Sequence, residues 1–187
     1  MTLVRPLATP GTRLALEIQH TWDGIAVGVD EVVAMTMELG HSELTLRIDA
    51  PFHGDPPPDG DDLWMFEVVE LMLVGADVAY LEVELSPHGQ YLVLCLHGER
   101  HVVERGAVLE YDATIQGARW QGVAHLPIGW LPVETSRLNA FAMHGRNQER
   151  RHLAWKPTGG PRPDFHRLKA FGLLAECLAD DTPPIGR

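Results

Sequence analysis

Cysteine is scarce in this chain of 187 residues, which has only Cys95 and Cys177. Small secreted domains that depend on disulfides have more cysteines, and a domain of this length buries enough surface to fold without such bridges. The chain also has no Cys-x-x-Cys pair, which excludes a structural zinc ribbon. Neither a disulfide framework nor a cysteine-bound zinc is therefore expected.

Long apolar runs are missing as well. No stretch of 18 consecutive apolar residues occurs, so no helix is expected to span a membrane. Near the start, Arg13 and Glu17 interrupt residues 1–19 before a signal-peptide hydrophobic region could form. We therefore expect a cytoplasmic protein with no membrane partner.

Basic residues are outnumbered, with 15 Lys and Arg against 26 Asp and Glu and a net charge of −11. Because polyanions are bound by basic surfaces, general nucleic-acid binding is not expected. Residues 140–169 are the exception, with seven basic and two acidic residues. These cations either pair with acidic loops elsewhere or face an anionic ligand such as a uronate or a phosphate-bearing sugar.

Sequence signatures of common enzymes are absent. There is no Gly-x-Ser-x-Gly elbow, His-Glu-x-x-His pair, Walker loop or Gly-x-Gly-x-x-Gly after a strand. Catalytic triads are defined by geometry, so this absence does not exclude catalysis. It favours a binding protein over an enzyme.

Alternation of apolar and polar residues is the dominant pattern, and it predicts β-strands with one buried face. Residues 67–74 are instead apolar on both faces, as in a central strand. Many short strands at about ten-residue spacing are typical of an antiparallel β-sandwich. Strands are predicted at residues 12–19, 32–39, 43–49, 67–74, 79–86, 91–96, 120–126, 137–143 and 151–155.

Turn clusters separate these strands, and none of them is a linker that would divide the chain. We therefore predict one all-β domain over residues 1–187, a single antiparallel β-sandwich with its core at about 12–172. Residues 164–179 are predicted to form a short C-terminal helix, and residues 180–187 a flexible tail.

Three glutamates are candidates for chemistry. Glu82 and Glu84 share one face of a predicted strand, about 6.6–6.8 Å apart. Glu70 lies among apolar neighbours, where burial would raise its pKa unless a partner compensates. Two interpretations stay open. The pair lines a solvated face while Glu70 pairs with an arginine, or the three serve a carbohydrate-active enzyme.

Cofactor signals are weak. The acidic run Asp59, Asp61 and Asp62 offers oxygen ligands for calcium but lacks the remaining positions of an EF-hand loop. The ten histidines are scattered without a metal-binding spacing. No cofactor is predicted, and calcium remains a possible ligand.

Several sequence blocks, in order, resemble the carbohydrate-binding module family nine-like superfamily. Within it, the resemblance is closest to a small uncharacterised family of cytosolic proteins. The blocks are residues 63–70, 80–89, 120–127, 138–142, 153–157 and 163–172.

The resemblance implies a sugar-binding β-sandwich without a catalytic apparatus. In those modules two tryptophans clamp a sugar ring, which carries over to Trp64 with Glu70 and to Trp155 with His152. His152 replaces an amide side chain, and the calcium sites of the modules have no clear match. We therefore predict a non-catalytic saccharide-binding protein. The alternatives are a carbohydrate-active enzyme using Glu70, Glu82 and Glu84, or a protein-interaction domain.

Overall fold

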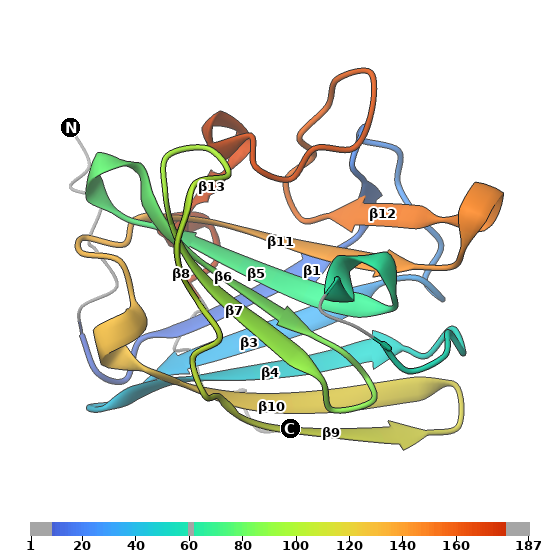
Figure 1. Ribbon diagram of the computed structural model, residues 1–187, viewed down its shortest axis with the longest axis horizontal. Helices are drawn as coiled ribbons and strands as arrows, with labels where there is room; N and C mark the ends of the chain where they lie inside the picture. Colours follow the sequence, from blue (N-terminus) through green and yellow to red (C-terminus); the bar gives the residue numbers. More distant parts are fainter. Residues whose placement is uncertain (1–8, 60–61, 179–187) are drawn as a thin grey trace, which may run out of the picture.

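Two antiparallel sheets pack face to face in the computed structural model, which describes residues 9–59 and 62–178 (Figure 1). The first sheet has the strand order β1-β3-β4-β10-β9. Its strands are β1 (Arg13–Ile18), β3 (Val33–Leu39), β4 (Glu43–Pro51), β9 (Glu110–Gln116) and β10 (Arg119–Pro127).

The second sheet has eight strands in the order β2-β12-β11-β5-β6-β7-β8, with β13 pairing on β11. Its strands are β2 (His20–Thr21), β5 (Val68–Val74), β6 (Ala79–Leu85), β7 (Tyr91–His97), β8 (Val102–Arg105), β11 (Arg137–His144), β12 (Arg151–Ala154) and β13 (Gly172–Leu173). The described helices are single 3-10 turns. They are η1 (Leu63–Met65), η2 (Ala76–Val78), η3 (Ile128–Trp130), η4 (Asn147–Glu149), η5 (Leu168–Ala170) and η6 (Leu174–Glu176).

The predicted antiparallel β-sandwich is confirmed, and each predicted strand corresponds to an observed one within two residues at either end. Four strands were not predicted, namely β2, β8, β9 and β13. Strand β8 is exposed along its whole length and lacks the alternation that marks a half-buried strand. Strand β9 does alternate in sequence (EYDATIQ), but it is exposed at most positions of the structure. The other two have only two residues each.

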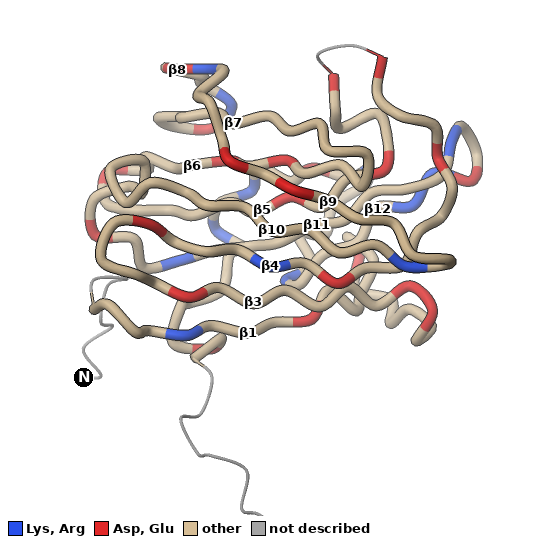
Figure 2. The backbone as a smooth tube through the Cα atoms, turned by 90° about the horizontal axis from the view of Figure 1, so that it is seen from below, with Lys and Arg blue, Asp and Glu red and all other residues tan. Residues whose placement is uncertain are grey.

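The main core lies between the two sheets and is built from the alternate side chains that each strand turns inward. Leu46 and Trp120 come from the first sheet, and Leu71, Val83 and Ala140 from the second. Each fully buried large apolar side chain stabilises the fold by roughly 1.5–3 kcal/mol. Figure 2 shows the strands β1, β3, β4 and β10 of the first sheet side by side, with Lys, Arg, Asp and Glu positions distributed over strands and loops.

A second apolar cluster lies on the outer face of the eight-stranded sheet. Residues 155–171, here called the cover segment, fold over this face and place Phe165 on Phe141, with ring centroids 4.0 Å apart. The cover explains why β5 is buried on both faces, as predicted. It also corrects one prediction, because the face of β6 with Glu82 and Glu84 is buried rather than solvated.

The predicted C-terminal helix is wrong for the described part of residues 164–179. This segment has only the turns η5 and η6, separated by β13. Part of its hydrogen bonding goes to the neighbouring strand β11 instead of along a helix. Gly172 and Leu173 pair with β11, and the Arg137 guanidinium donates to the Lys169 and Phe171 carbonyl oxygens.

Some of the sequence predictions concern residues that the structure does not describe. Asp61, the middle of the acidic run, and the tail 180–187 lie outside them. Within residues 9–59 and 62–178, no cluster of three His, Cys, Asp or Glu side chains has a metal-binding arrangement. No helix in the same ranges is long and apolar enough to cross a membrane.

Candidate functional site

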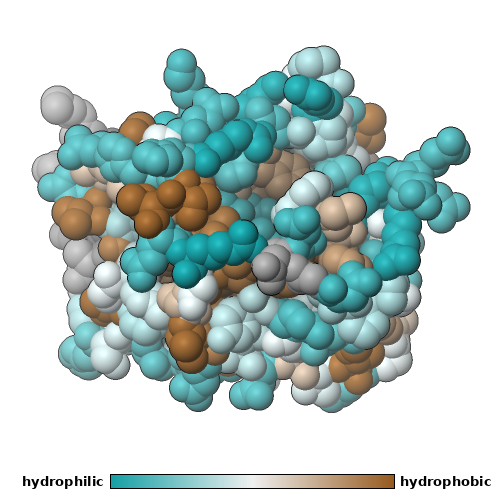
Figure 3. All heavy atoms as spheres, viewed as in Figure 1, coloured by the Kyte–Doolittle hydropathy of each residue, from teal (hydrophilic) through white to brown (hydrophobic). Residues whose placement is uncertain are grey.

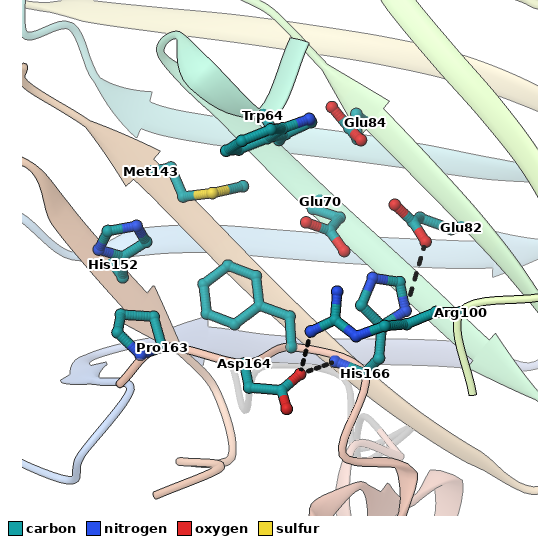
Figure 4. Close-up of a pocket in the computed structure, with 11 residues that line it drawn as sticks. Trp64, Glu70, Glu82, Glu84, Arg100, Met143, His152, Pro163, Asp164 and His166 are labelled. Atoms are coloured by element: carbon teal, nitrogen blue, oxygen red, sulfur yellow. Dashed lines mark hydrogen bonds and ion pairs between the residues drawn. The ribbon is translucent and has the colours of Figure 1, made fainter. Parts of the chain in front are cut away.

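A cavity of about 370 Å³ lies between the outer face of the eight-stranded sheet and the cover segment (Figure 4). Small-molecule sites commonly have roughly 300–1,000 Å³, so the cavity suits a small ligand. Its lining combines acidic, aromatic and imidazole side chains. They are Trp64, Glu70, Glu82, Glu84, Arg100, Met143, His152, Pro163, Asp164, Phe165 and His166.

Two adjacent strands supply the three glutamates. Glu70 of β5 is in register with Glu84 of β6, and Glu82 follows two residues away on the same face of β6. The three residues are only 2%, 2% and 5% exposed, respectively. Figure 4 shows their carboxyl groups gathered at one end of the cavity, away from His152 and Pro163.

Burial raises the pKa of all three carboxyl groups. The pKa of Glu70 lies well above its usual range because of burial and the charges of Glu82 and Glu84. Burial raises the pKa of Glu82 to about 7, against a hydrogen bond with Glu84 and the charge of Arg100. For Glu84, burial and the neighbouring Glu82 raise the pKa to about 8. The cluster therefore retains protons near neutral pH.

These carboxyl groups have unused hydrogen-bonding capacity. Among the described residues, Glu70 Oε1, Glu82 Oε2 and Glu84 Oε2 are buried without a hydrogen-bond partner. Buried polar atoms nearly always have a partner in folded proteins, and each exception requires an explanation. Three exceptions in one cavity point to a site that is completed by a ligand.

His166 borders the cluster as a neutral imidazole. The backbone N–H of Arg100 donates to Tyr80 Oη at 3.1 Å, and the Tyr80 hydroxyl lies 2.7 Å from His166 Nδ1. Burial and Arg100 lower the pKa of His166 to about 4, so the ring is neutral and one of its two nitrogens is an acceptor. Glu82 Oε2 lies 4.0 Å from the same nitrogen, which is beyond hydrogen-bonding distance.

An ion pair and an exposed ring form part of the rim. The Arg100 guanidinium donates to Asp164 Oδ1 at 2.6 Å, connecting the turn after β7 to the cover segment. Trp64 in η1 is 52% exposed, a large value for a tryptophan that also lines a cavity. Exposed aromatic rings beside polar groups are common in sites that bind amphipathic ligands.

Arg150 fixes the position of the turn that presents Trp64. Its guanidinium donates to the carbonyl oxygens of Trp64, Phe66 and Gly145, and the side chain is 13% exposed. Residues 64–66 and the β11–β12 hairpin are thereby held together by charge-assisted hydrogen bonds.

Three of the four residues predicted for a sugar clamp line this cavity. Trp64, Glu70 and His152 line the cavity, and the His152 ring lies 6.0 Å from Phe165 in an edge-to-face arrangement. Trp155 does not line it. Its ring instead packs against the main core and Gly172, with Lys156 Nζ 4.5 Å from the ring centroid.

The strand pattern explains the separation of His152 and Trp155. In β12, Leu153 faces the main core and Ala154 belongs to the outer cluster. Side chains alternate along a strand, so two residues three positions apart face opposite sides. Trp155 accordingly points to the side of Leu153, and His152 points to the cavity.

No local sequence pattern marks Arg100, Asp164 or His166 as site residues. They come from a turn and from the cover segment, and only the folding of that segment over the sheet brings them together. The basic residues of 140–169 mostly have partners within the chain. Arg151 pairs with Glu31, and Lys156 with Glu176, which supports the interpretation of internal pairing.

A smaller hollow of about 240 Å³ continues from the cavity towards β7 and β8. It shares Trp64, Glu82 and Glu84 with the cavity and adds Asp62 and Arg105. On the face seen in Figure 3, apolar patches lie among hydrophilic side chains. The exposed Val102 of β8 contributes apolar surface to this hollow.

Two solved structures are similar in fold. One is a candidate carbohydrate-binding protein from Bacteroides uniformis ATCC 8492, with a TM-score of 0.67 and 16% identity, covering 86% of this chain and 84% of that chain. The other is a carbohydrate-binding module of family 9 from Caldicellulosiruptor kristjanssonii in complex with glucose. Its TM-score is 0.55 and its sequence identity is 10%, and the match covers 83% of this chain and 82% of that chain.

No family model matches the chain, but sequence relatives do. The human UPF0462 protein C4orf33 is 38% identical over 170 residues, covering 83% of this chain and 84% of that protein. Its homologue from Mus musculus is 37% identical over 169 residues, covering 83% and 88%. That from Danio rerio is 34% identical over 168 residues, covering 82% and 85%. With such identity over most of both chains, the protein belongs to the UPF0462 family.

Proposed function

We propose that the protein binds a small saccharide, without catalysis, in the cavity of the eight-stranded sheet. The observation that carries the proposal is the combination, in one cavity, of the exposed Trp64 ring with buried carboxyl oxygens that have no partner. A sugar ring has C–H faces that stack on an aromatic side chain and hydroxyl groups that donate to such oxygens.

Two comparisons support the proposal. The similar family 9 module was solved with glucose, and the Bacteroides protein is described as a candidate carbohydrate binder. The same sandwich architecture therefore occurs with saccharide ligands, although fold alone does not determine function. We assign the chain to the family nine-like superfamily as part of this proposal.

Thermal unfolding with a saccharide panel tests the proposal, because a ligand that binds only the native state raises the midpoint. We expect a shift for one class of sugar, reduced at least about tenfold in apparent affinity by Trp64→Ala. Trp130→Ala is the control, since this ring packs against the main core and does not line the cavity. Equal affinity in wild type and Trp64→Ala would contradict the proposed site.

A second candidate function is glycoside hydrolysis, favoured by the pKa values of about 7 and 8 for neighbouring Glu82 and Glu84. A carboxyl group that retains its proton near neutral pH suits a general acid, and its ionised neighbour suits a base. Turnover of a glycoside panel with a bell-shaped pH dependence, abolished by Glu70→Gln, would support this candidate. Absence of turnover for any saccharide that binds would exclude it.

A further inference from the structure

We propose that the ligand bears a primary ammonium group, as an amino sugar does, and that Glu70, Glu82 and Glu84 bind this ammonium together. The inference rests on the proposed function and specifies its ligand class. It follows from the number of free acceptors in the cavity and from the charges around them.

The free acceptors match an ammonium group in number. One oxygen of each glutamate is buried without a partner among the described residues. The three side chains come from paired positions of β5 and β6 and share one end of the cavity (Figure 4). A primary ammonium group has three N–H donors and no acceptor, whereas a hydroxyl group has one donor and two lone pairs. An ammonium can therefore donate to all three oxygens without bringing an acceptor close to them.

The ionisable groups around the cavity would also balance a bound cation once the glutamates release their protons to accommodate it. The acids that line the cavity and the adjoining hollow outnumber the arginines five to two in the described chain. Arg100 is paired with Asp164 at 2.6 Å, and Arg105 lies in the hollow towards β8. His152 and His166 add no charge, because burial lowers the pKa of both rings. The acids are Glu70, Glu82, Glu84, Asp164 and Asp62.

The raised pKa values are consistent with this ligand. A buried carboxyl cluster without a cation compensates by taking up protons, as Glu82 and Glu84 do. An ammonium group in contact with the cluster would stabilise the ionised carboxylates instead. Trp64 lies at the same end of the cavity as Glu84 (Figure 4), where its ring can contact both the sugar face and the cation.

The experiment compares three sugars that differ at one position. Calorimetric titrations at pH 7 and low salt use glucosamine, glucose and N-acetylglucosamine, of which only the first has a charged amine. We expect glucosamine to bind at least about tenfold more tightly than the other two sugars. One charge-assisted hydrogen bond contributes enough binding free energy for such a difference in affinity. High salt should reduce this preference, because it depends on charge.

Two isosteric variants and a control test whether the glutamates cause the preference for glucosamine. Glu70→Gln and Glu84→Gln each keep the side-chain volume, and each should reduce glucosamine affinity towards that of glucose. Glu17→Gln removes one carboxylate from the exposed face of β1 and should leave the preference unchanged. Unfolding curves of all variants confirm that the compared proteins are folded.

The outcomes separate this inference from the proposed function. Equal affinities for the three sugars would overturn the ammonium inference while supporting saccharide binding. If cyclohexylamine bound in a Glu84-dependent way and no saccharide did, ammonium recognition would stand and saccharide binding would fail. If neither glucosamine nor cyclohexylamine bound, the inference would be overturned.

Discussion

Glu70 and Glu84 lie directly opposite each other across β5 and β6, with both side chains on the buried outer face of the sheet. Like charges at directly opposed positions destabilise an antiparallel pair. The raised pKa values of both residues show how the sheet tolerates them, since protonation removes the repulsion. Protonation therefore connects the stability of the ligand-free protein to pH.

The first prediction concerns this pH dependence. The folded pKa values of Glu82 and Glu84, about 7 and 8, exceed their usual value of 4.5, so the folded state binds more protons. Their contribution to stability is fully present below about pH 4.5 and is lost as the pH rises through 7 and 8. His144 and His166 act oppositely between pH 4 and 6.5, because burial lowers both pKa values to about 4. Above pH 6.5 only the glutamate effect remains.

We therefore expect the free energy of unfolding to fall between pH 6.5 and 8.5 in urea titrations. Glu84→Gln should flatten this decline and stabilise the protein at pH 8.5 by on the order of 2 kcal/mol, since one pKa unit corresponds to about 1.4 kcal/mol. Glu17→Gln should retain the slope of the wild type. An unchanged slope in Glu84→Gln would contradict the assignment of the decline to this cluster.

The second prediction separates the two tryptophans. Trp155 packs on the main core, and a Cβ added to Gly172 would lie 2.6 Å from its ring. Trp155→Ala should cost about 3 kcal/mol of stability, as expected for loss of a large packed ring, with little effect on ligand affinity while the protein is folded. Trp64→Ala should show the reverse, with less than about 1 kcal/mol lost and weakened binding. A loss of ligand affinity in folded Trp155→Ala would contradict this prediction, because it would mean that Trp155 contributes to the binding site.

The architecture could be predicted from the sequence because hydrophobic alternation is local. β1 and β4, for example, each have one buried and one exposed face, and period-two patterns identify them directly. β6 has the same alternation, but Glu82 and Glu84 are buried by a segment about 80 residues further along the chain. No local pattern contains that information.

The site was partly predictable for the same reason. Glu70 stood out because a charged residue in an apolar strand is unusual, and Trp64 because of the resemblance to sugar-binding modules. Arg100 and His166 reach the cavity only through tertiary contacts with Asp164 and Tyr80. The position of Trp155 could have been predicted from the local sequence. It lies three residues after His152, and residues three apart in a strand face opposite sides.

The third prediction concerns Arg150, whose guanidinium holds the Trp64 turn. Arg150→Lys has no planar fork to reach the carbonyl oxygens of Trp64, Phe66 and Gly145 together. We expect a loss of about 1–3 kcal/mol in urea unfolding and weaker ligand binding, because the Trp64 ring is no longer held in place. Arg151→Lys is the matched control. Its partly exposed pair with Glu31 should contribute less than about 1 kcal/mol, and its binding should equal that of the wild type.

The final prediction concerns Asn139, which anchors the start of the cover segment. Its side-chain amide donates to the Lys156 carbonyl oxygen at 2.8 Å, and its carbonyl oxygen accepts from the Lys156 N–H at 3.0 Å. Asn139 is fully buried, so Asn139→Leu would keep the volume but leave both Lys156 backbone groups without these partners. We expect the loss of these hydrogen bonds to lower the free energy of unfolding by about 2–4 kcal/mol.

The same substitution should loosen the cover before it unfolds the sandwich. Hydrogen exchange should accelerate at the Trp155 amide, which donates to the Ala140 carbonyl oxygen at 2.8 Å, while the β4–β10 amides remain protected. Gln121→Leu, at an exposed position of β10, should change neither measurement by a comparable amount. Equal acceleration in both sheets would mean that the cover and the sandwich unfold as one unit, and the cavity could then not open without global unfolding.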